Sequence, residues 1–523
     1  MLEKVIKTWY NVIQLRIVNC GYYTLVAENR TKQNLYRLFL KIELGYTAPN
    51  NVCIWAGAAQ WRKFLMSYIN TVYTVTSVLF AILTLCCIHF IFFAIVGLFR
   101  KKTYPETDTK LRYGIIIPAR NEEFVVGNLI DSVKRNKYPQ DKLEIFVIAH
   151  NCTDKTAEIA RAHGAVVYEY NNPEECTMGY AFRYLFKMIK RDYGIESFDG
   201  FFLFNADNVL DVNYFSKMND AFVACGRKNV ITSFRNSKNF GENLISACYG
   251  LYFVYGCRFE SRGRTALGCS TRVQGTGYVI PASVVKEGWK YVTLTEDWEF
   301  TADRILLGEK IEFCDDAVFY DEQPTSLRVM WRQRVRWSKG HLLVCFSRFT
   351  DMFRELFSPK KDGVPVNKGS VYDIMINITP MCVITTSLIL LEIFAVLFSP
   401  FFGVKISTAI KTIIVKNLGF YAIAYVMMII ASCIIYVIER DRIKHVSFPI
   451  KLLSVLLWPL FLVISVPAEL VALFQKNVTW QVIPHTNTTS FSDLNCCCAE
   501  HETHETEEEK VENEFAMDAA SEE

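Results

Sequence analysis

Four long apolar segments constrain the fold of this chain more than any other feature of its sequence. They lie at residues 71–99, 374–402, 417–438 and 448–474. A helix needs about 20 apolar residues to cross a lipid bilayer, and each segment reaches that length. Hydrophobic residues make up 51% of the 523 residues, which is high for a soluble protein. The sequence therefore predicts a membrane protein with several transmembrane helices.

The fourth segment is less regular than the other three. It contains three prolines and two charged residues, Pro449, Pro459, Pro467, Lys451 and Glu469. Proline interrupts a helix because it has no backbone N–H and its ring clashes with the preceding turn. Non-helical backbone is tolerated at membrane depth only where protein or water covers it. Residues 448–474 are therefore expected either to span the membrane or to form a kinked re-entrant or interfacial segment.

Basic residues beside the apolar segments predict how the chain is oriented. Loops rich in Lys and Arg remain on the cytoplasmic side of a membrane. Arg100–Lys102 follows the first segment, and Arg440–Lys444 follows the third. We therefore predict a multi-pass protein of the plasma membrane in which residues 112–325 are cytosolic. Residues 1–70 also carry many basic residues, so they fit this topology only if they lie on the membrane surface.

Charge and cysteine content exclude some classes of function. The formal net charge of +3 is too small to indicate nucleic acid binding. Several of the 17 cysteines lie in apolar segments, where a free cysteine behaves as a small hydrophobic residue. No CxxC pair recurs at the spacing of a zinc site, so we expect a reducing compartment and no structural metal. Residues 1–16 lack the apolar core of a cleavable signal peptide, and none is expected.

Between the first and second apolar segments, buried strands alternate with amphipathic helices. Strands are expected at residues 113–118, 143–149, 165–170 and 201–204, and helices at 124–136, 154–164 and 178–191. This alternation predicts an α/β domain with a mostly parallel sheet that is covered on both faces. Ligands of such sheets bind beyond the carboxyl ends of the strands.

Polar clusters follow three of these strands. They are Arg120–Glu123, His150–Asp154 and Asn205–Asp207. Asn and Asp are also ordinary turn residues, so each cluster alone could simply end a strand. Three clusters at the same edge of one sheet favour a binding site instead.

Three short motifs occur in a fixed order: NAD at 205–207, LTEDWEF at 294–300 and RQRVRWSKG at 332–340. With them, the chain resembles the membrane-embedded family 2 glycosyltransferases, which include hyaluronan, cellulose and poly-N-acetylglucosamine synthases. That family combines PxYNE, an Asp-rich strand tip, DxD, TED and QxxRW with transmembrane helices. The resemblance implies a cytosolic GT-A nucleotide-sugar transferase domain at 112–325, inserted between transmembrane helices. It also implies amphipathic interfacial helices at 326–358.

The resemblance assigns residues to the donor, which it implies is a UDP-sugar. Asp207 would hold a divalent metal, Mg²⁺ or Mn²⁺, because both prefer hard oxygen ligands. Glu122 of PARNEE would contact the base or ribose, and Asn205 would lie beside the metal. Arg336 would contact the diphosphate, to which the planar guanidinium is well matched. A cation and a positioned Arg stabilise the negative charge that develops on the leaving group.

The resemblance also assigns the acceptor side. Asp297 of TED would be the catalytic base that takes the proton of the acceptor hydroxyl, with Glu296 beside it. Gln333 and Trp337 match QxxRW, and Arg334 lies between them. Trp337 would be the platform on which an acceptor sugar stacks.

Structural explanations of these motifs remain open. Thr295 could cap a helix whose first turn is acidic. Residues 332–340 could form a basic helix lying on the bilayer. GTGYVIP, which begins with Gly275, could be a tight turn, although the family uses this place to line the acceptor path.

Four residues depart from the family pattern. Asn205 replaces the first carboxylate of DxD, Ala149 and His150 replace carboxylates of the second strand tip, and Met178 replaces a Lys before GYA. An Asn carbonyl binds metal without charge, so we expect weaker metal affinity. These departures leave open which nucleotide is bound.

The C-terminal segment, 475–523, is expected to end in an acidic disordered tail. Cys496–Cys498 with His501 and His504 could bind metal, but chance occurrence in a flexible tail is favoured. Val478–Trp480 resembles the gating segment that cellulose synthases place over the nucleotide.

These observations lead to three hypotheses. The first is an inverting, processive glycosyltransferase that polymerises a polysaccharide from a UDP-sugar and passes the growing chain through its own helices. The second is a transferase that adds a single sugar to a lipid acceptor. The third is a low-activity partner of another synthase, motivated by Asn205, Ala149 and Met178.

Overall fold

The computed structural model describes residues 52–358, 366–402 and 405–476, together with Val478, His485 and 487–489. The chain divides into two units, Met1–Tyr68 and Ile69–Glu523, and the second contains the whole α/β domain. The expected surface location of most of the N-terminal segment falls outside the described residues. The Cys and His residues of the acidic tail also lie outside them.

A mostly parallel sheet of eight strands forms the centre of the α/β domain, as the sequence predicts. In the order of the chain, the strands are β1 (Tyr113–Ala119), β2 (Leu143–His150), β3 (Val166–Tyr170), β4 (Gly200–Leu203), β5 (Val209–Leu210), β6 (Val230–Ser237), β7 (Tyr278–Pro281) and β8 (Ile311–Asp321). Across the sheet they run β3-β2-β1-β4-β7-β6-β8-β5. β7 is antiparallel to both neighbours and β5 is antiparallel to β8, whereas the other pairs are parallel.

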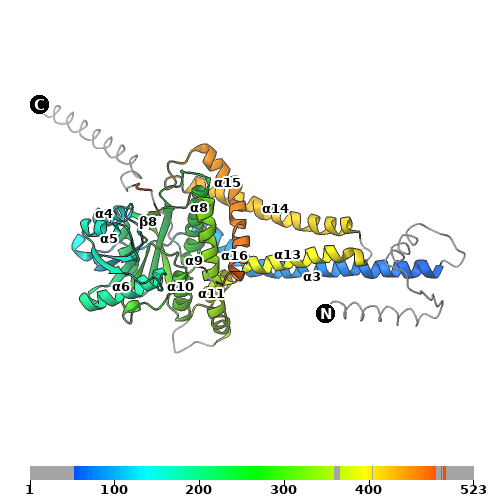
Figure 1. Cartoon of the computed structure of the whole chain (residues 1–523), viewed down its shortest axis with the longest axis horizontal. Helices are drawn as coiled ribbons and strands as arrows, with labels where there is room; N and C mark the ends of the chain where they lie inside the picture. Colours follow the sequence, from blue (N-terminus) through cyan, green and yellow to red (C-terminus); the bar gives the residue numbers. More distant parts are fainter. Residues whose placement is uncertain are drawn as a thin grey trace, which may run out of the picture. The chain divides into compact units, whose positions relative to one another are not determined.

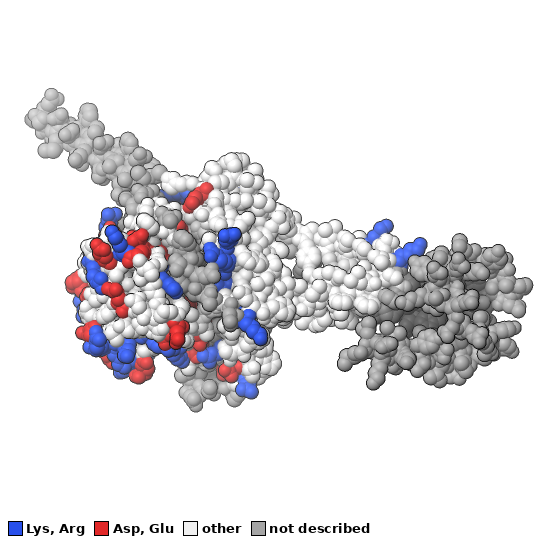
Figure 2. Space-filling model, viewed as in Figure 1, with Lys and Arg blue, Asp and Glu red and all other residues white. Residues whose placement is uncertain are grey.

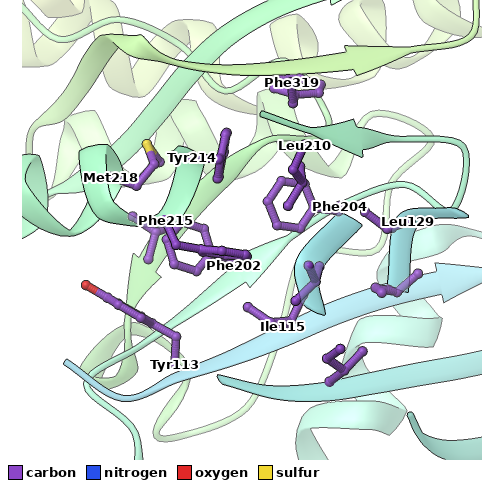
Figure 3. Packing of buried hydrophobic residues seen from close by; sticks show 14 of the residues in the cluster. Tyr113, Ile115, Leu129, Phe202, Phe204, Leu210, Tyr214, Phe215, Met218 and Phe319 are labelled. Atoms are coloured by element: carbon purple, nitrogen blue, oxygen red, sulfur yellow. The ribbon is translucent and has the colours of Figure 1, made fainter. Parts of the chain in front are cut away.

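Helices cover both faces of this sheet. They are α4 (Val126–Lys134), α5 (Thr156–Ala162), α6 (Met178–Asp192), α7 (Tyr214–Ala224), α8 (Leu244–Tyr255), α9 (Arg262–Ala266) and α10 (Glu296–Leu306). Successive side chains of a strand point to opposite faces. Ile115 and Phe202 therefore join one core with Phe215 of α7 (Figure 3). Ile116 and Phe201 join the opposite core, beneath α6.

Among the described residues, six further helices follow the sheet and one long helix precedes it. These are α11 (Leu327–Phe357), α12 (Lys368–Ile378), α13 (Met381–Phe398), α14 (Ile406–Ile438), α15 (Phe448–Val463) and α16 (Ser465–Phe474), with α3 (Val52–Phe99) before β1. Within the described residues, four stretches are long and apolar enough to cross a membrane, namely Asn70–Phe99, Met381–Phe398, Ile406–Ile438 and Phe448–Phe474. Charged residues gather over the α/β domain and leave α13 and α14 almost uncharged (Figure 2).

Two of the segments expected from the sequence are arranged differently in the structure. The apolar segment at 374–402 divides at Thr379 and Pro380, because a residue that precedes proline disfavours helical backbone. Its first part belongs to α12, which packs against α11, and only α13 remains as a candidate span. The interfacial helices expected at 326–358 are a single continuous helix, α11.

The fourth apolar segment divides at Ile464 into α15 and α16. α15 packs against α8 and α14, and α16 packs against α11 and α13. Both helices run across the direction of α13 and α14 rather than alongside them (Figure 1). The segment therefore joins the α/β domain to the candidate spans.

A buried carboxylate links three of the candidate spans. Glu392 of α13 is 2% exposed. It accepts hydrogen bonds from Thr76 Oγ1 of α3 and Asn417 Nδ2 of α14, each at 2.7 Å. A buried polar group is costly unless it is hydrogen-bonded, so this triad favours association of the three helices.

Candidate active site

One cavity brings together almost all of the residues that the motifs single out. It lies at the carboxyl ends of β1, β4 and β8 and continues along α11. The predicted site residues that line it are Glu122, Asn205, Asp207, Gly275, Glu296, Asp297, Gln333, Arg336 and Trp337. Of the predicted site residues, Arg334 alone does not line it.

The loop that follows β1 is held by the loop that follows β2. Asn121 has a positive φ of 58°, and its Oδ1 accepts a hydrogen bond from Thr153 N at 2.8 Å. The next backbone N–H, that of Glu122, donates to Thr156 Oγ1 at 2.8 Å. These contacts fix the backbone that carries the Glu122 carboxylate into the cavity. Burial raises the pKa of this carboxylate.

Asp207 is oriented by neighbouring residues at the end of β4. Its Oδ1 accepts from Asn208 Nδ2 at 3.1 Å, and its Oδ2 accepts from the backbone N–H of Glu322 at 3.0 Å. Glu322 follows Asp321, the last residue of β8. Burial raises the pKa of Asp321 to about 6, and the charge of Asp207 adds to this effect, whereas Arg235 opposes it. The ends of β4 and β8 therefore bring the buried carboxylates of Asp207 and Asp321 close together.

These acids fit a divalent cation that is shared with a substrate. Within the described residues, no group of three or more His, Cys, Asp or Glu side chains is arranged to hold a metal alone. Mg²⁺ and related ions commonly use one or two carboxylates together with substrate phosphates. Asp207, with Asn205 beside it, offers hard oxygen ligands of this kind.

The two acids of TED lie at the start of α10. The Thr295 side chain makes no capping hydrogen bond, and its buried Oγ1 has no partner among the described residues. The expected side-chain cap is therefore not formed. Burial and the neighbouring Asp297 charge raise the pKa of Glu296 to about 8, and burial raises that of Asp297 to about 6. Asp297 is therefore the more acidic of the two carboxyl groups and the one that more readily carries the negative charge.

Gly275 lies directly beside this base. Its φ of +80° is one that residues with a side chain rarely adopt. A Cβ at this position would lie 3.6 Å from Asp297 Oδ2. Glycine therefore leaves open the space in front of the carboxylate.

α11 directs the side chains of QxxRW to two different sides. Gln333 and Trp337 are one turn apart and face the cavity. Gln333 Oε1 is buried without a hydrogen-bond partner in the described chain. Trp337 packs edge-on against Tyr249 and Phe253, with ring centroids 6.2 and 6.3 Å apart.

Arg334 lies on a different side of α11 because adjacent helical residues are about 100° apart. Its guanidinium lies 4.6 Å from the centroid of the Phe461 ring and donates to Ser465 Oγ at 3.1 Å. Arg334 therefore packs α11 against α15 and α16 and is not one of the residues that line the cavity. Arg336 does line the cavity, and it donates to the backbone carbonyl of Leu294 at 3.2 Å.

A C-terminal residue completes the donor end of the cavity. His485 Nδ1 lies 2.9 Å from Glu122 Oε2. Burial lowers the pKa of His485, but the charges of Asp207, Glu122 and Glu322 outweigh burial and raise it to about 9. Nearby, Asn487 N donates to Glu322 Oε2 at 3.1 Å. The only sequence signal for this location was the resemblance of 478–480 to a gating segment, of which Thr479 and Trp480 lie outside the described residues.

The sequence also did not identify Arg235, which holds the loop that contains Gln274 and Gly275. Arg235, near the end of β6, donates to Asp321 Oδ2 at 2.7 Å and to the Gln274 carbonyl at 2.9 Å. It thereby connects the end of β8 to the residue before Gly275. The sequence of β6 is neither fully apolar nor regularly alternating, so the strand itself was not predicted. The position of Arg235 near the end of a strand was therefore not recognised as a signal.

Three of the residues that depart from the family pattern surround the donor end. His150 and Met178 line the cavity, and Ala149 is buried at the end of β2. His150 Nε2 lies 2.7 Å from the Glu175 carbonyl. Burial lowers its pKa, so the imidazole is neutral at physiological pH. Neutral groups therefore occupy positions where the family has charged ones.

Comparisons with known proteins agree with this geometry. Residues 111–340 match the family model described as Glycosyltransferase like family 2. The chain is 25% identical over 256 residues to the probable glycosyltransferase YdaM of Bacillus subtilis, covering 46% of this chain and 58% of that protein. It is 24% identical over 234 residues to a beta-monoglucosyldiacylglycerol synthase of Nostoc sp., covering 43% and 48%. The chain thus spans about half the length of these curated relatives.

Solved structures of transferases align with parts of this chain. The mannosyltransferase PcManGT from Pyrobaculum calidifontis, in complex with GDP-Man and Mn²⁺, aligns with a TM-score of 0.48 at 12% identity, covering 79% of this chain and 100% of that chain. S. aureus TarS aligns with a TM-score of 0.33 at 14% identity, covering 52% and 43%. Residues 111–340 therefore form a glycosyltransferase domain that is similar to family 2 and has a GT-A-like fold.

Proposed function

We propose that this protein transfers a sugar from a nucleoside diphosphate donor to an acceptor hydroxyl, with inversion at the anomeric carbon. The observation that carries the proposal is the location of Asp297. This carboxylate lies in one cavity with the strand-tip acids on one side and Gln333 and Trp337 on the other. A base in that position serves a reaction between a donor and an acceptor that enter from opposite ends.

The donor end is assigned by charge and shape. Glu122 and His485 would contact the base or ribose of a uridine or related nucleotide. Arg336 would contact the diphosphate, and Asp207 with Asn205 would hold a divalent cation. Such a cation, when bound, neutralises charge on the leaving diphosphate.

The chemical step needs one proton acceptor. Asp297 takes the proton of the acceptor hydroxyl as the oxygen bonds to the anomeric carbon, and the bond from that carbon to the diphosphate breaks. Attack from the face opposite the leaving group inverts the configuration. Arg336 stabilises the negative charge on the departing diphosphate. Glu296, neutral at physiological pH, remains a hydrogen-bond donor beside the base.

Contacts between the domain and the candidate spans support a shared membrane orientation. Lys101, just after α3, lies 3.8 Å from Asp315 of β8. Arg442, just after α14, lies 3.4 Å from the same carboxylate. The ends of both helices therefore lie on the side of the catalytic domain. This fits a multi-pass protein with a cytosolic domain and an α13–α14 hairpin, in which α15 and α16 are interfacial.

A single transfer to a membrane-borne acceptor is favoured over polymer synthesis. In the described part of the chain, α3, α13 and α14 have only 6–11% of their apolar windows buried and Phe448–Phe474 has 33%, so the low burial of these three helices gives no support to a polymer path that they enclose. The relative named beta-monoglucosyldiacylglycerol synthase supports a lipid acceptor. Processive synthesis remains the second candidate, because Trp337 provides an aromatic platform beside the base.

Product size tests the proposed function. Purified protein in nanodiscs would be incubated with radiolabelled UDP- or GDP-sugars, divalent metal and membrane lipids. We expect a labelled lipid that carries one added sugar. A long labelled polymer would instead favour the processive alternative. If no donor is consumed while the nucleotide still binds, the protein is a partner rather than an enzyme.

Metal dependence tests the role of residues 205–207. Asn205→Asp adds a carboxylate beside Asp207, so we expect half-maximal activity at a lower Mg²⁺ or Mn²⁺ concentration. Asp207→Asn keeps an oxygen for the Glu322 N–H but removes the charge, so activity should fall and excess metal should restore it only partly. Metal titrations of the parent and both variants measure this. Full activity of Asp207→Asn at low metal would leave these residues as a strand end only.

A further inference from the structure

The cavity continues past Asp297, away from the donor end. Its far part is lined by Tyr255, Gly256, Glu260, Arg272, Trp298 and His341. Of these residues, only Trp298 belongs to a motif that suggested the active site, LTEDWEF at 294–300. They come from α8 and the turn after it, from the segment before β7, from α10 and from α11.

An ion pair forms one wall of this far part. Residues Gly256–Ser261 form a π-helical turn, a feature that often occurs at functional sites. Glu260 on this turn lies 2.6 Å from Arg272 Nη1 and 3.0 Å from Arg264 Nη1. Arg272 Nη1 also donates to Asn377 Oδ1 at 3.2 Å. Hydrogen bonds within the described chain involve only Nη1 of Arg272, so the rest of its planar fork is available to a ligand.

His341 extends the row of acceptor-facing side chains on α11. Gln333, Trp337 and His341 are spaced four residues apart, so they lie on one face of the helix along about 12 Å, at 1.5 Å per residue. The His341 ring packs edge-on against Trp298, with centroids 4.4 Å apart. Among the described residues, neither of its ring nitrogens has a hydrogen-bond partner.

The imidazole of His341 is neutral. Burial and the nearby Arg272 charge lower its pKa to about 4. A neutral imidazole presents one N–H donor and one nitrogen acceptor. Gln333 adds an unpartnered carbonyl oxygen, since its Oε1 is buried without a partner in the described chain.

We propose that Glu260, Arg272 and His341 form an acceptor subsite for a polyhydroxylated group, such as a sugar ring of a glycolipid or saccharide. The inference rests on the proposed transferase function and specifies its acceptor. Hydroxyl groups need paired donors and acceptors, which the neutral imidazole, the guanidinium and the carboxylate supply together. Trp298 and Trp337 supply aromatic surface for the apolar face of such a ring. A bare diacylglycerol would leave the His341 ring nitrogens and Gln333 Oε1 without hydrogen-bond partners, which is unfavourable.

Saccharide binding tests this subsite without relying on catalysis. Cellobiose, maltose and N,N′-diacetylchitobiose would be titrated into full-length Asp297→Asn protein by calorimetry, with saturating nucleotide present. We expect at least one disaccharide to bind. His341→Ala in the same background should weaken that binding about tenfold, the effect of losing one or two hydrogen bonds. Arg272→Lys, which keeps the charge but loses the planar fork, should weaken it similarly.

A histidine elsewhere in the domain provides the matched control. His163 lies 2.8 Å from Asp131 at the end of α5 and does not line the cavity. His163→Ala should leave saccharide binding unchanged. Two results would overturn the proposed subsite. One is equal disaccharide affinity of the Asp297→Asn protein with and without His341→Ala. The other is that no disaccharide binds the Asp297→Asn protein.

Activity on lipid acceptors separates the two sources of the sugar ring. In active protein, vesicles that contain monoglucosyldiacylglycerol should accept label more readily than vesicles with diacylglycerol alone if the ring belongs to a glycolipid. Preference for the free disaccharide would identify a saccharide acceptor. Preference for diacylglycerol over both would contradict the subsite while leaving the proposed transferase function intact. Absence of transfer to every acceptor would count against the proposed function, whereas the binding result would still decide the subsite.

Discussion

Asp297→Asn is expected to lower the rate of sugar transfer by about 10²–10⁴-fold, the usual contribution of a general base. An Asn side chain cannot accept the proton of the acceptor hydroxyl. The change should leave the affinity for the nucleotide-sugar almost unaltered, because the base acts on the acceptor in the transition state. Transfer rates and the dissociation constant of the donor, measured on the same preparations, test both statements.

Glu296→Gln is the matched control for this substitution. The Glu296 pKa is raised to about 8 by burial and by Asp297, so this side chain is already neutral at pH 7. Gln preserves its size and neutrality, and transfer should change far less than in Asp297→Asn. If both variants lose transfer equally, the proton is not taken by Asp297 alone. Parent-level activity of Asp297→Asn would remove this residue from the mechanism.

Asp373→Leu is expected to lower the free energy of unfolding by about 3–5 kcal/mol, the usual cost of breaking a buried ion pair by removing one partner. Asp373 is fully buried on α12. Its two oxygens accept from Arg264 Nε at 2.7 Å and Nη2 at 3.1 Å. His89 of α3 lies 3.0 Å from the same carboxylate. The variant therefore leaves the buried Arg264 guanidinium with Glu260 as its main counter-charge.

Thermal unfolding of the detergent-solubilised protein measures this loss. The double variant Arg264→Met with Asp373→Leu should recover part of the stability, since it removes the unpaired charge. Asp131→Leu is the surface control, because Asp131 pairs with His163 at an exposed site and such pairs contribute about 1 kcal/mol or less. If Asp373→Leu lowers the melting temperature no more than Asp131→Leu does, the Arg264–Asp373 ion pair contributes little to stability.

The first half of the sheet was predictable because its strands are buried on both faces. β1, β2 and β4 appear in the sequence as mostly apolar runs, and α6 has a clear amphipathic period. β6 and β8 were not predicted, because polar residues occur along both strands, and one of them in each strand lines the cavity. Arg235 and Asp321 interrupt the pattern that would otherwise identify these strands. The polar residues of β6 and β8 therefore concealed both strands in the sequence.

The candidate site was predictable only where it is linear in sequence. Asp297, Gln333 and Trp337 belong to short motifs whose order identifies them. His485 was missed because it reaches Glu122 from 363 residues away, a contact that no local pattern encodes. Arg334 was predicted to belong to the site because it neighbours Gln333 in the sequence. In a helix, however, adjacent residues point to different sides. His341 follows Trp337 by four residues in the sequence, but only the structure shows that both line the cavity.

Glu392 sets an order for the biosynthesis of this protein. Its first partner, Thr76, is synthesised 316 residues earlier, and its second, Asn417, follows 25 residues later. When α13 leaves the ribosome, the carboxylate therefore has only one of its two donors. In the proposed membrane topology an unpaired polar group in lipid is unfavourable, so α13 and α14 should enter the bilayer together as a hairpin that packs against α3. A nascent chain that stalls between them would present an unsatisfied carboxylate to lipid.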